Sequence, residues 1–172
     1  MEVVTGPDSI LNQALARLVD QYQTALLRMC YLYLHDAALA EDAVQETFLK
    51  AYKAMPAFHG DCSEKTWLMR IAVNTCRDMQ RSAWFRHVDR RVTPDVLPDA
   101  STPVEEADEE LTLAIMRLPR KLREAVMLYY YQDMSETEIA AALEVVPSTV
   151  SNRLKHARKK LRATLEGGHF HG

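Results

Sequence analysis

Residues 135–158 contain the side chains best suited to contact DNA. Ile139 and Leu143, a three-residue link, and then Val150 and Leu154 follow the spacing of two short helices that pack against each other. This pattern predicts a helix-turn-helix, in which the start of the second helix reaches base edges and phosphates. The residues predicted to contact duplex DNA are Ser148, Thr149, Ser151, Asn152, Arg153, Lys155, His156, Arg158 and Lys159. The alternative is an ordinary helical hairpin with a solvated basic face.

A second set of polar side chains lies on one face of the helix expected after the loop at residues 56–63. Arginines recur there at helical spacing beside an indole, so partners for phosphates lie next to an aromatic platform for bases. This combination suits single-stranded or melted DNA. The candidates are Trp67 and a polar stripe made of Arg70, Asn74, Arg77, Asp78 and Arg81. Two structural alternatives stay open, since Trp67 is also suited to a core and Arg77 to an ion pair with a nearby acid.

The helix expected before Pro56 offers a third surface, opposite its apolar side. Two acids, an amide and a leucine align at i, i+3, i+4 and i+7, which are Asp42, Gln45, Glu46 and Leu49. We expect this acidic face to dock a basic helical partner. Carboxylates at this spacing also occur in di-metal helical bundles, but the pair of Glu-x-x-His motifs used by those centres is absent. No metal site is therefore predicted.

Residues for covalent catalysis are not evident. The sequence has no Gly-rich phosphate loop, no HExxH motif and no GxSxG motif. His35, His59 and Cys62 lack an oriented partner at a meaningful spacing. We therefore expect a protein that binds and does not catalyse, with no cofactor.

Helices must position these surfaces, and the composition favours helix. Only 5 of the 172 residues are Gly, while 26% are charged, and Ala, Leu, Glu, Lys and Arg fill long stretches. Apolar residues recur at helical spacing over 11–33, 40–51 and 68–79. The expected helix caps are Asp8 or Ser9, then Asp36, and finally Asp61 in a capping box with Glu64. Later helices are expected over 105–118, 120–131 and 135–143 and from 148 onward.

Charge divides the chain more clearly than its net value of −3 indicates. Six arginines lie between residues 70 and 91, seven acids without any Lys or Arg lie between 95 and 110, and a second basic segment follows from 151. Three of the seven prolines fall within 92–103. We therefore predict an all-α protein with a three-helix domain over 1–91, a flexible acidic linker over 92–107 and a helix-turn-helix domain over 108–172.

The cysteine pattern and the hydropathy of the chain indicate the cellular compartment in which the protein is expected. Cys30, Cys62 and Cys76 are odd in number and lack CxxC spacing, and no signal-peptide pattern opens the sequence. No apolar run approaches the roughly 20 residues that span a bilayer. We expect a reduced, cytoplasmic protein without direct membrane insertion.

From about Leu15 to Leu165 the chain resembles the extracytoplasmic-function (ECF) sigma factors, small two-domain members of the sigma-70 family. The stretch Asp36–Tyr52, with AEDAVQETFLK at its centre, looks like the helix that docks on the β′ clamp helices of RNA polymerase. Phe58–Arg81, with TWL and RIAVNTCRD, is similar to the segment that melts the minus-ten element and holds its non-template strand. Residues 118–165 look like the second sigma domain, whose helix-turn-helix reads the minus-thirty-five element.

This resemblance implies a role for each surface. Asp42, Gln45, Glu46 and Leu49 would bind core polymerase, the polar stripe would hold melted DNA, and the helix from Ser148 would read duplex DNA. The implied partners are core RNA polymerase, through its β′ clamp helices and β flap, and promoter DNA. Similar chains respond to stress or another signal and are usually held by an anti-sigma factor, often membrane-anchored.

The chain departs from the family pattern at four positions that bear on specificity, one of them Pro147, which appears one residue late. Glu144 and Ser148 stand where glycines are common, within the turn that sets the angle of the second helix. Glu64 replaces a frequent aromatic beside the loop Phe58–Ser63, which in relatives captures a flipped base. These departures leave the recognised promoter sequence open.

The main rival interpretation is a free-standing helix-turn-helix regulator. Such a protein binds duplex DNA alone, as a dimer with symmetric half-sites. It needs neither the acidic face nor the polar stripe, so the sequence favours the sigma-factor interpretation.

Overall fold

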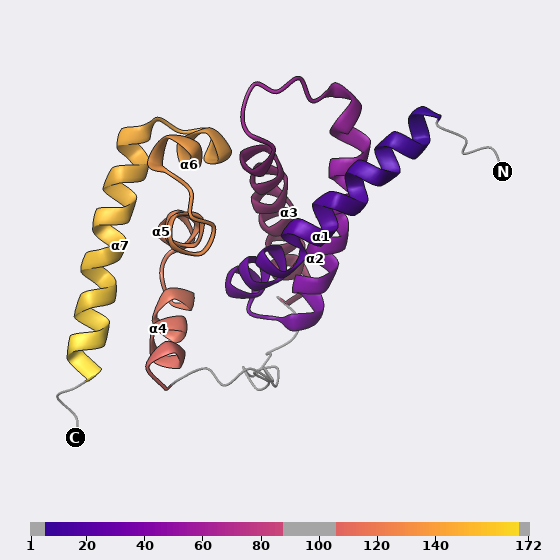
Figure 1. Ribbon diagram of the computed structural model, residues 1–172. Helices are drawn as coiled ribbons and strands as arrows, with labels where there is room; N and C mark the ends of the chain where they lie inside the picture. Colours follow the sequence, from indigo (N-terminus) through magenta and orange to yellow (C-terminus); the bar gives the residue numbers. More distant parts are fainter. Residues whose placement is uncertain (1–5, 88–105, 169–172) are drawn as a thin grey trace.

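The computed structural model describes residues 6–87 and 106–168, which form two groups of helices (Figure 1). The first domain contains α1 (Pro7–Leu34), α2 (Ala37–Ala54), the short 3-10 helix η1 (Met55–Ala57) and α3 (Glu64–His87). The second contains α4 (Glu106–Met116), α5 (Arg120–Val126), the π-helix η2 (Met127–Tyr131), α6 (Glu136–Leu143) and α7 (Pro147–Gly168). The predicted all-α fold with two helical domains is confirmed. The predicted linker, 92–107, lies outside the described residues except for its last two.

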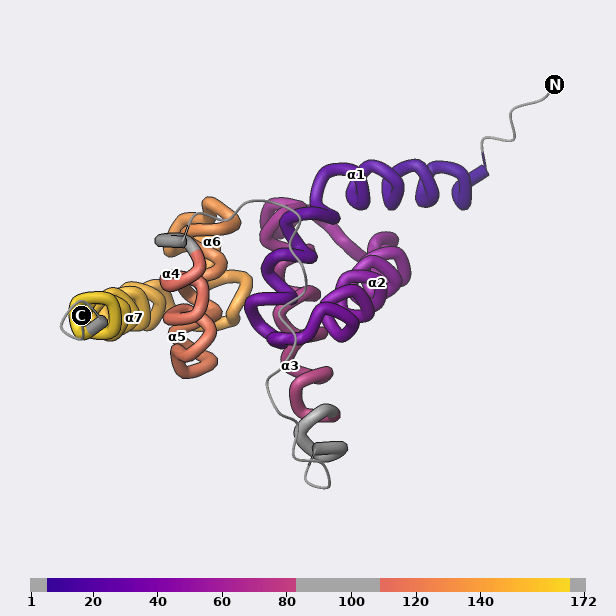
Figure 2. The backbone as a smooth tube through the Cα atoms, turned by 90° about the horizontal axis from the view of Figure 1, so that it is seen from below, coloured from indigo at the N-terminus to yellow at the C-terminus, as the bar shows by residue number. Residues whose placement is uncertain are grey.

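The first domain is built on the apolar stripes predicted from the sequence. Helix α1 packs on α2 and α3, and Leu26 and Met29 of α1, Phe48 of α2 and Leu68 of α3 are buried. Alanines on α2 allow the helix axes to approach closely. The N-terminal part of α1 projects beyond the other helices of its domain (Figure 2).

The helix caps are only partly those expected. Asp36 caps α2, because its carboxylate accepts a hydrogen bond from the Leu39 N–H at 2.9 Å. Asp8 and Ser9 were wrong as caps: α1 already begins at Pro7, whose missing N–H suits the first turn. The capping box of Asp61 with Glu64 was also wrong, because the Ser63 hydroxyl accepts the N–H of Thr66 at 3.1 Å instead.

The second domain departs from the sequence prediction in one helix. The helix expected over 120–131 is present, but its second half, η2, is a π-helix that ends at Tyr131. Asp133 then takes a left-handed conformation with φ of 51°. Ile139, Leu143, Val150 and Leu154 form the buried seam between α6 and α7, as predicted.

The two domains lie against each other. Helix α3 packs on α6, while α1 packs on α4, α5 and η2. Helix α7 lies on the side of the second domain that faces away from the first, as the two views agree (Figures 1 and 2). The side chains at this junction decide which candidate site residues remain accessible.

Candidate nucleic-acid interface

The helix-turn-helix is fixed locally at both ends of α6. Ser135 and Glu138 form a capping box on α6, in which each side chain accepts the other residue's backbone N–H at 3.1 Å. The link after Leu143 begins at Glu144, which is left-handed with φ of 58° and donates its N–H to the Ala140 carbonyl. The predicted three-residue link is therefore confirmed, with Glu144 in the conformation that glycine adopts most easily.

The outer face of α7 presents most of the predicted duplex-contacting residues to solvent. Thr149 and Arg153 are half-buried. The exposed ones are Ser148, Ser151, Asn152, Lys155, His156, Arg158 and Lys159. This face combines hydroxyl, amide and cationic groups at the start of a helix, as recognition helices do.

Arg158 is turned toward its own domain. Its Nε donates to the Tyr130 hydroxyl at 2.8 Å, and its guanidinium lies over the rings of Tyr129 and Tyr130 at 5.5 and 5.8 Å. Arg158 is thus held on the flank of α7 and differs in placement from Lys155 and Lys159.

The polar stripe on α3 is divided by the second domain. Asn74, Asp78 and Arg81 are exposed. Arg70 donates to the carbonyl of Ala141 in α6, with Nη2 at 2.8 Å. The stripe that the sequence predicted as one surface therefore has an open part and a part in contact with α6 and α5.

Arg77 contacts a buried carboxylate of the second domain. Its Nε and Nη2 donate to the two oxygens of Glu124 at 2.9 and 2.8 Å, and the Tyr33 hydroxyl donates to Glu124 at 2.6 Å. Arg120 approaches the same carboxylate at 3.8 Å. The Glu124 side chain has no exposed surface. The alternative that Arg77 pairs with an acid holds in this structure, but the acid comes from the other domain.

The electrostatics of this cluster keep Glu124 ionised. Burial raises the pKa of Glu124, but the hydrogen bonds from Arg77 and Tyr33, together with the charges of Arg77 and Arg120, hold the pKa below its ordinary value of 4.5. Burial and the adjacent carboxylate raise the pKa of Tyr33, so its hydroxyl stays a donor. The pair thus carries full opposite charges.

A second polar contact joins the domains at the end of α1. The Arg123 Nη1 donates to His35 Nε2 at 2.7 Å and to the Met116 carbonyl at 3.0 Å. The Arg123 guanidinium also lies 5.6 Å from the centre of the Tyr33 ring. Burial lowers the pKa of Arg123, and its buried Nε has no hydrogen-bond partner among the described residues.

Further backbone carbonyls accept hydrogen bonds across the junction. Lys65 of α3 donates to the carbonyl of Gln132, and the Gln132 side chain donates to the Ala25 carbonyl at 3.1 Å. The sequence pattern does not single out Lys65, Tyr33 or Glu124 as functional residues. Their partners are distant in sequence, so local spacing carries no signal for them.

An aromatic pocket lies at the start of the stripe. Trp67 is half-buried, and its ring stacks on Phe58 with a centroid distance of 4.7 Å. The cavity measures about 240 Å³ and is lined by Ala54, Ala57, Phe58, His59, Asp61, Cys62, Trp67 and Arg70. The sequence predicted a shared DNA-binding role for Trp67 and Arg70. It did not predict that Phe58 stacks on Trp67.

The acidic face of α2 is accessible. Asp42 and Gln45 are exposed, Glu46 is half-buried, and Leu49 keeps 54% of its surface in solvent. Leu49 therefore adds exposed apolar surface beside the carboxylates of the same helix face.

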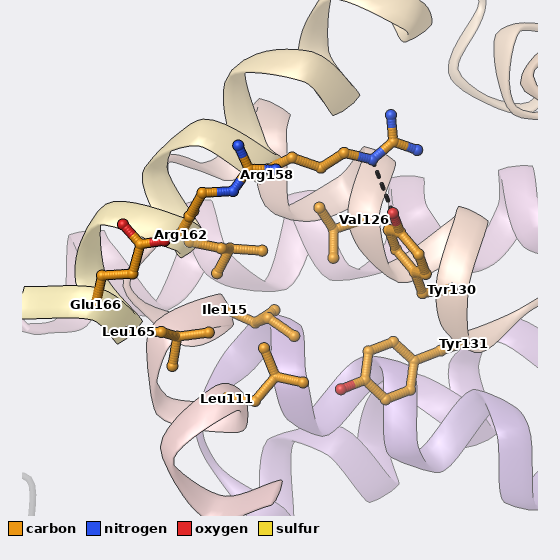
Figure 3. Close-up of a pocket in the computed structure, with 10 residues that line it drawn as sticks. Leu111, Ile115, Val126, Tyr130, Tyr131, Arg158, Arg162, Leu165 and Glu166 are labelled. Atoms are coloured by element: carbon orange, nitrogen blue, oxygen red, sulfur yellow. Dashed lines mark hydrogen bonds between the residues drawn. The ribbon is translucent and has the colours of Figure 1, made fainter. Parts of the chain in front are cut away.

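A larger groove lies on the second domain, between α4, η2 and α7. It measures about 600 Å³. Leu111, Ile115 and Leu165 point into it, and the Arg158–Tyr130 hydrogen bond lies at its edge (Figure 3). Its lining is mostly apolar, so the groove suits an apolar partner segment.

Two further observations concern membrane spans and metal sites among the described residues. None of the helices of residues 6–87 and 106–168 is both long and apolar enough to cross a membrane. Within the same ranges, no three His, Cys, Asp or Glu side chains gather as ligands for a metal ion.

Family models match both domains. Sigma-70 region 2 matches residues 18–86, and Sigma-70, region 4 matches residues 108–161. The first range includes the acidic face, the aromatic pair and the polar stripe, and the second includes the helix-turn-helix.

Relatives match over nearly the whole chain. The RNA polymerase sigma-H factor of Pseudomonas aeruginosa is 32% identical, over 90% of this chain and 88% of that protein. The ECF RNA polymerase sigma factor SigL of Mycobacterium tuberculosis is 34% identical, over 96% of this chain and 97% of that protein. SigW of Bacillus subtilis, another ECF sigma factor, is 30% identical over 90% of both chains.

Solved structures agree in fold. CnrH, in complex with the cytosolic domain of CnrY, matches with a TM-score of 0.70 and 26% identity over 91% of this chain and 90% of that chain. The sigma factor RpoE of Bartonella quintana, in complex with the anti-sigma factor NepR, matches with a TM-score of 0.77 and 22% identity over 88% and 96%. The two matched domains and the full-length relatives show that the chain belongs to the ECF family of RNA polymerase sigma factors.

Proposed function

We propose that this sigma factor divides promoter recognition between its domains. The outer face of α7 reads minus-thirty-five duplex, while Trp67 and the polar stripe of α3 hold the melted minus-ten strand. The observation that carries the proposal is the separation of an exposed basic face on α7 from a distant aromatic and cationic surface on α3. Duplex and unstacked DNA need such different surfaces, because only unstacked bases can lie on aromatic rings. Stabilising open DNA takes the place of catalysis.

The acidic face of α2 is our candidate for docking on the β′ clamp helices of core polymerase. Support comes from the exposed Leu49 next to Asp42, Gln45 and Glu46 on the same helix face. The apolar groove of the second domain is the candidate site for the β flap, since Leu111, Ile115 and Leu165 offer apolar surface for a partner segment.

The proposed domain limits are 1–91 and 108–172, joined by a linker over 92–107. A linker joins the two binding modules into one molecule. Once one domain has bound its DNA element, the linker raises the effective concentration of the other domain near its own element. The acidic residues of the linker fit a path through a channel built for nucleic acid.

An anti-sigma factor is the proposed regulator, and the cytoplasm is the proposed location. One structure similar in fold is the sigma factor RpoE in complex with the anti-sigma factor NepR, and another is CnrH in complex with the cytosolic domain of CnrY. We extend this mode of control to the present chain. No cofactor is part of the proposal.

Transcription by core RNA polymerase from a promoter of the host, with and without this protein, tests the function. We expect specific initiation only when the protein is present. Glu46→Ala should reduce co-purification with core polymerase, whereas Glu41→Ala, an exposed acid outside the docking set, should not. Unchanged co-purification of Glu46→Ala would remove the docking assignment.

A further inference from the structure

Two of the three cysteines meet in the core of the first domain. Cys30 of α1 and Cys76 of α3 are separated by 46 positions, yet their Sγ atoms lie 3.4 Å apart. Both residues are fully buried, and both are free thiols. The third cysteine, Cys62, is half-buried and precedes α3. The packing of α1 on α3 therefore creates a buried dithiol, for which the spacing of the cysteines in the sequence gives no signal.

We propose that Cys30 and Cys76 form a redox modification site, at which a hydroperoxide oxidises the two thiols to a disulfide that fastens α1 to α3. The proposal is independent of the proposed function, because it concerns the core of the first domain alone. In proteins of reducing compartments, the disulfides that do form are usually transient. We accordingly expect the bond to form under oxidant and to be reversed by a thiol reductant.

Only a small movement separates the thiol pair from the disulfide. A disulfide holds its sulfurs roughly 2.05 Å apart, so the two Sγ atoms at 3.4 Å have to approach by about 1.4 Å. Cys76 lies on the buried side of α3, whereas Asn74 and Asp78 are exposed. The bond therefore forms inside the domain and adds nothing to the exposed face of α3.

The contact between the thiols assigns a different role to each sulfur. The Cys76 thiol donates its hydrogen to the Cys30 sulfur. This hydrogen bond, burial and the negative charge of Glu124 raise the pKa of Cys76, which keeps it a neutral thiol. Cys30 is therefore the sulfur that we assign to react with the oxidant, and Cys76 is the one that completes the disulfide.

The reaction balances in two steps. The Cys30 sulfur first attacks the outer oxygen of the hydroperoxide, ROOH, and the O–O bond breaks. The Cys30 proton goes to the departing oxygen, which leaves as the alcohol ROH, and Cys30 becomes a sulfenic acid. The Cys76 sulfur then attacks the Cys30 sulfur, the S–O bond breaks, and hydroxide leaves with the Cys76 proton as water. The two sulfurs together lose two electrons, and the peroxide oxygens gain them.

Burial makes the first step slow and leaves the second step fast. Neither sulfur is exposed, so the oxidant reaches Cys30 only when α1 and α3 separate locally. Once the sulfenic acid has formed, Cys76 is already beside it and reacts before a second oxidation to the sulfinic acid. The site therefore responds to sustained exposure and not to a brief pulse of oxidant.

The test uses the full chain with Cys62→Ser, which removes the accessible thiol and the bonds that it would form between chains. The protein is incubated with hydrogen peroxide and denatured, and N-ethylmaleimide then blocks any remaining thiols. Mass spectrometry of the proteolytic peptides identifies the state of each sulfur. Thermal melts are recorded before the treatment, after it, and again after addition of dithiothreitol.

We expect peptides joined through Cys30 and Cys76 within one chain, together with a rise in Tm of about 10 °C. The rise follows because the bond closes a loop between positions 46 residues apart in the unfolded chain. Dithiothreitol should reverse it, since dithiothreitol reduces a disulfide and leaves methionine sulfoxides in place. Two free thiols after treatment, a sulfinic acid on Cys30, or a disulfide without the rise in Tm would each overturn the proposal.

The matched control adds Cys30→Ala to the same chain, and Cys76→Ala takes its place if circular dichroism shows that the first variant is not folded. Each removes one sulfur of the pair and keeps every methionine. Peroxide should therefore leave the Tm of the control without any increase that dithiothreitol reverses. A reversible increase of the same size in the control would show that the effect does not come from the Cys30–Cys76 pair.

Discussion

His35 lies at the junction of the domains, where its imidazole accepts a hydrogen bond from Arg123 at 2.7 Å. Burial and the neighbouring guanidinium lower the pKa of His35 from 6.5, so the folded chain favours the neutral ring. Protonation would place two cations in contact. This single side chain therefore makes the domain junction sensitive to acid.

We expect the wild-type chain to lose thermal stability as the pH falls below 6.5. The unfolded chain takes up the proton first, so the stability present above pH 6.5 is lost as the pH falls toward the lower folded pKa. His35→Asn should weaken this pH dependence, since Asn tolerates the left-handed backbone with φ of 59° but does not titrate. Thermal melts of both proteins across this range measure the difference. Identical pH dependence would show that His35 contributes nothing.

Glu124 contributes in a separate, more acidic window. Its pKa is held below 4.5 by Arg77 and Tyr33 against the effect of burial, so its contribution is present above pH 4.5 and is lost as the pH falls further. The loss of stability thus begins near pH 6.5 for His35 and near pH 4.5 for Glu124, so the two effects differ in their onset.

At the scale of the elements, the start of α2 depends on one side chain. Asp36→Ala should destabilise the protein by about 1 kcal/mol, because the Leu39 N–H loses its acceptor. This corresponds to a fall in the melting temperature of roughly 2–4 °C. Asp8→Ala is the matched control, since Asp8 lies in the first turn of α1 and does not cap it. An equal fall for both variants would contradict the cap assignment.

The turn of the helix-turn-helix carries a conformational cost at Glu144. A non-glycine residue in the left-handed region destabilises the fold by roughly 1–2 kcal/mol. Glycine removes this strain, but it loses more chain entropy on folding, which costs about 0.5–1 kcal/mol. With φ of 58° and an exposed side chain, Glu144→Gly should therefore stabilise the protein by about 0.5 kcal/mol.

Chemical denaturation measures this gain, and Ala163→Gly serves as its control. Ala163 lies exposed within α7, where glycine should instead cost about 1 kcal/mol. Destabilisation by both substitutions would show that Glu144 makes a compensating contact.

At the scale of the whole molecule, the division of labour between domains predicts two different defects. Arg153→Ala should weaken binding of minus-thirty-five duplex by roughly tenfold, as the loss of one arginine contact does. Asn74→Ala should leave duplex binding unchanged and reduce promoter melting, measured by reactivity of unpaired thymines in the polymerase complex. Equal effects of both variants on duplex binding would contradict the division.

The helical architecture could be predicted because its causes are local. Apolar spacing placed the buried faces of the helices, and the paired apolar residues around a three-residue link identified the helix-turn-helix. Local reasoning failed where two local signals compete: Pro7 starts α1 before Asp8 or Ser9 can cap it, and Ser63 displaces Asp61 as the cap of α3.

The sequence by itself determined which residue types line α2, α3 and α7, because helical periodicity assigns faces to side chains. Only the tertiary structure decided which of them are accessible. Arg77 and Glu124 are separated by 47 positions, and Arg70 and Ala141 by 71, so no spacing rule connects them. Their pairing follows from the packing of one domain on the other, where a charge buried by that contact must find its counter-charge across the interface.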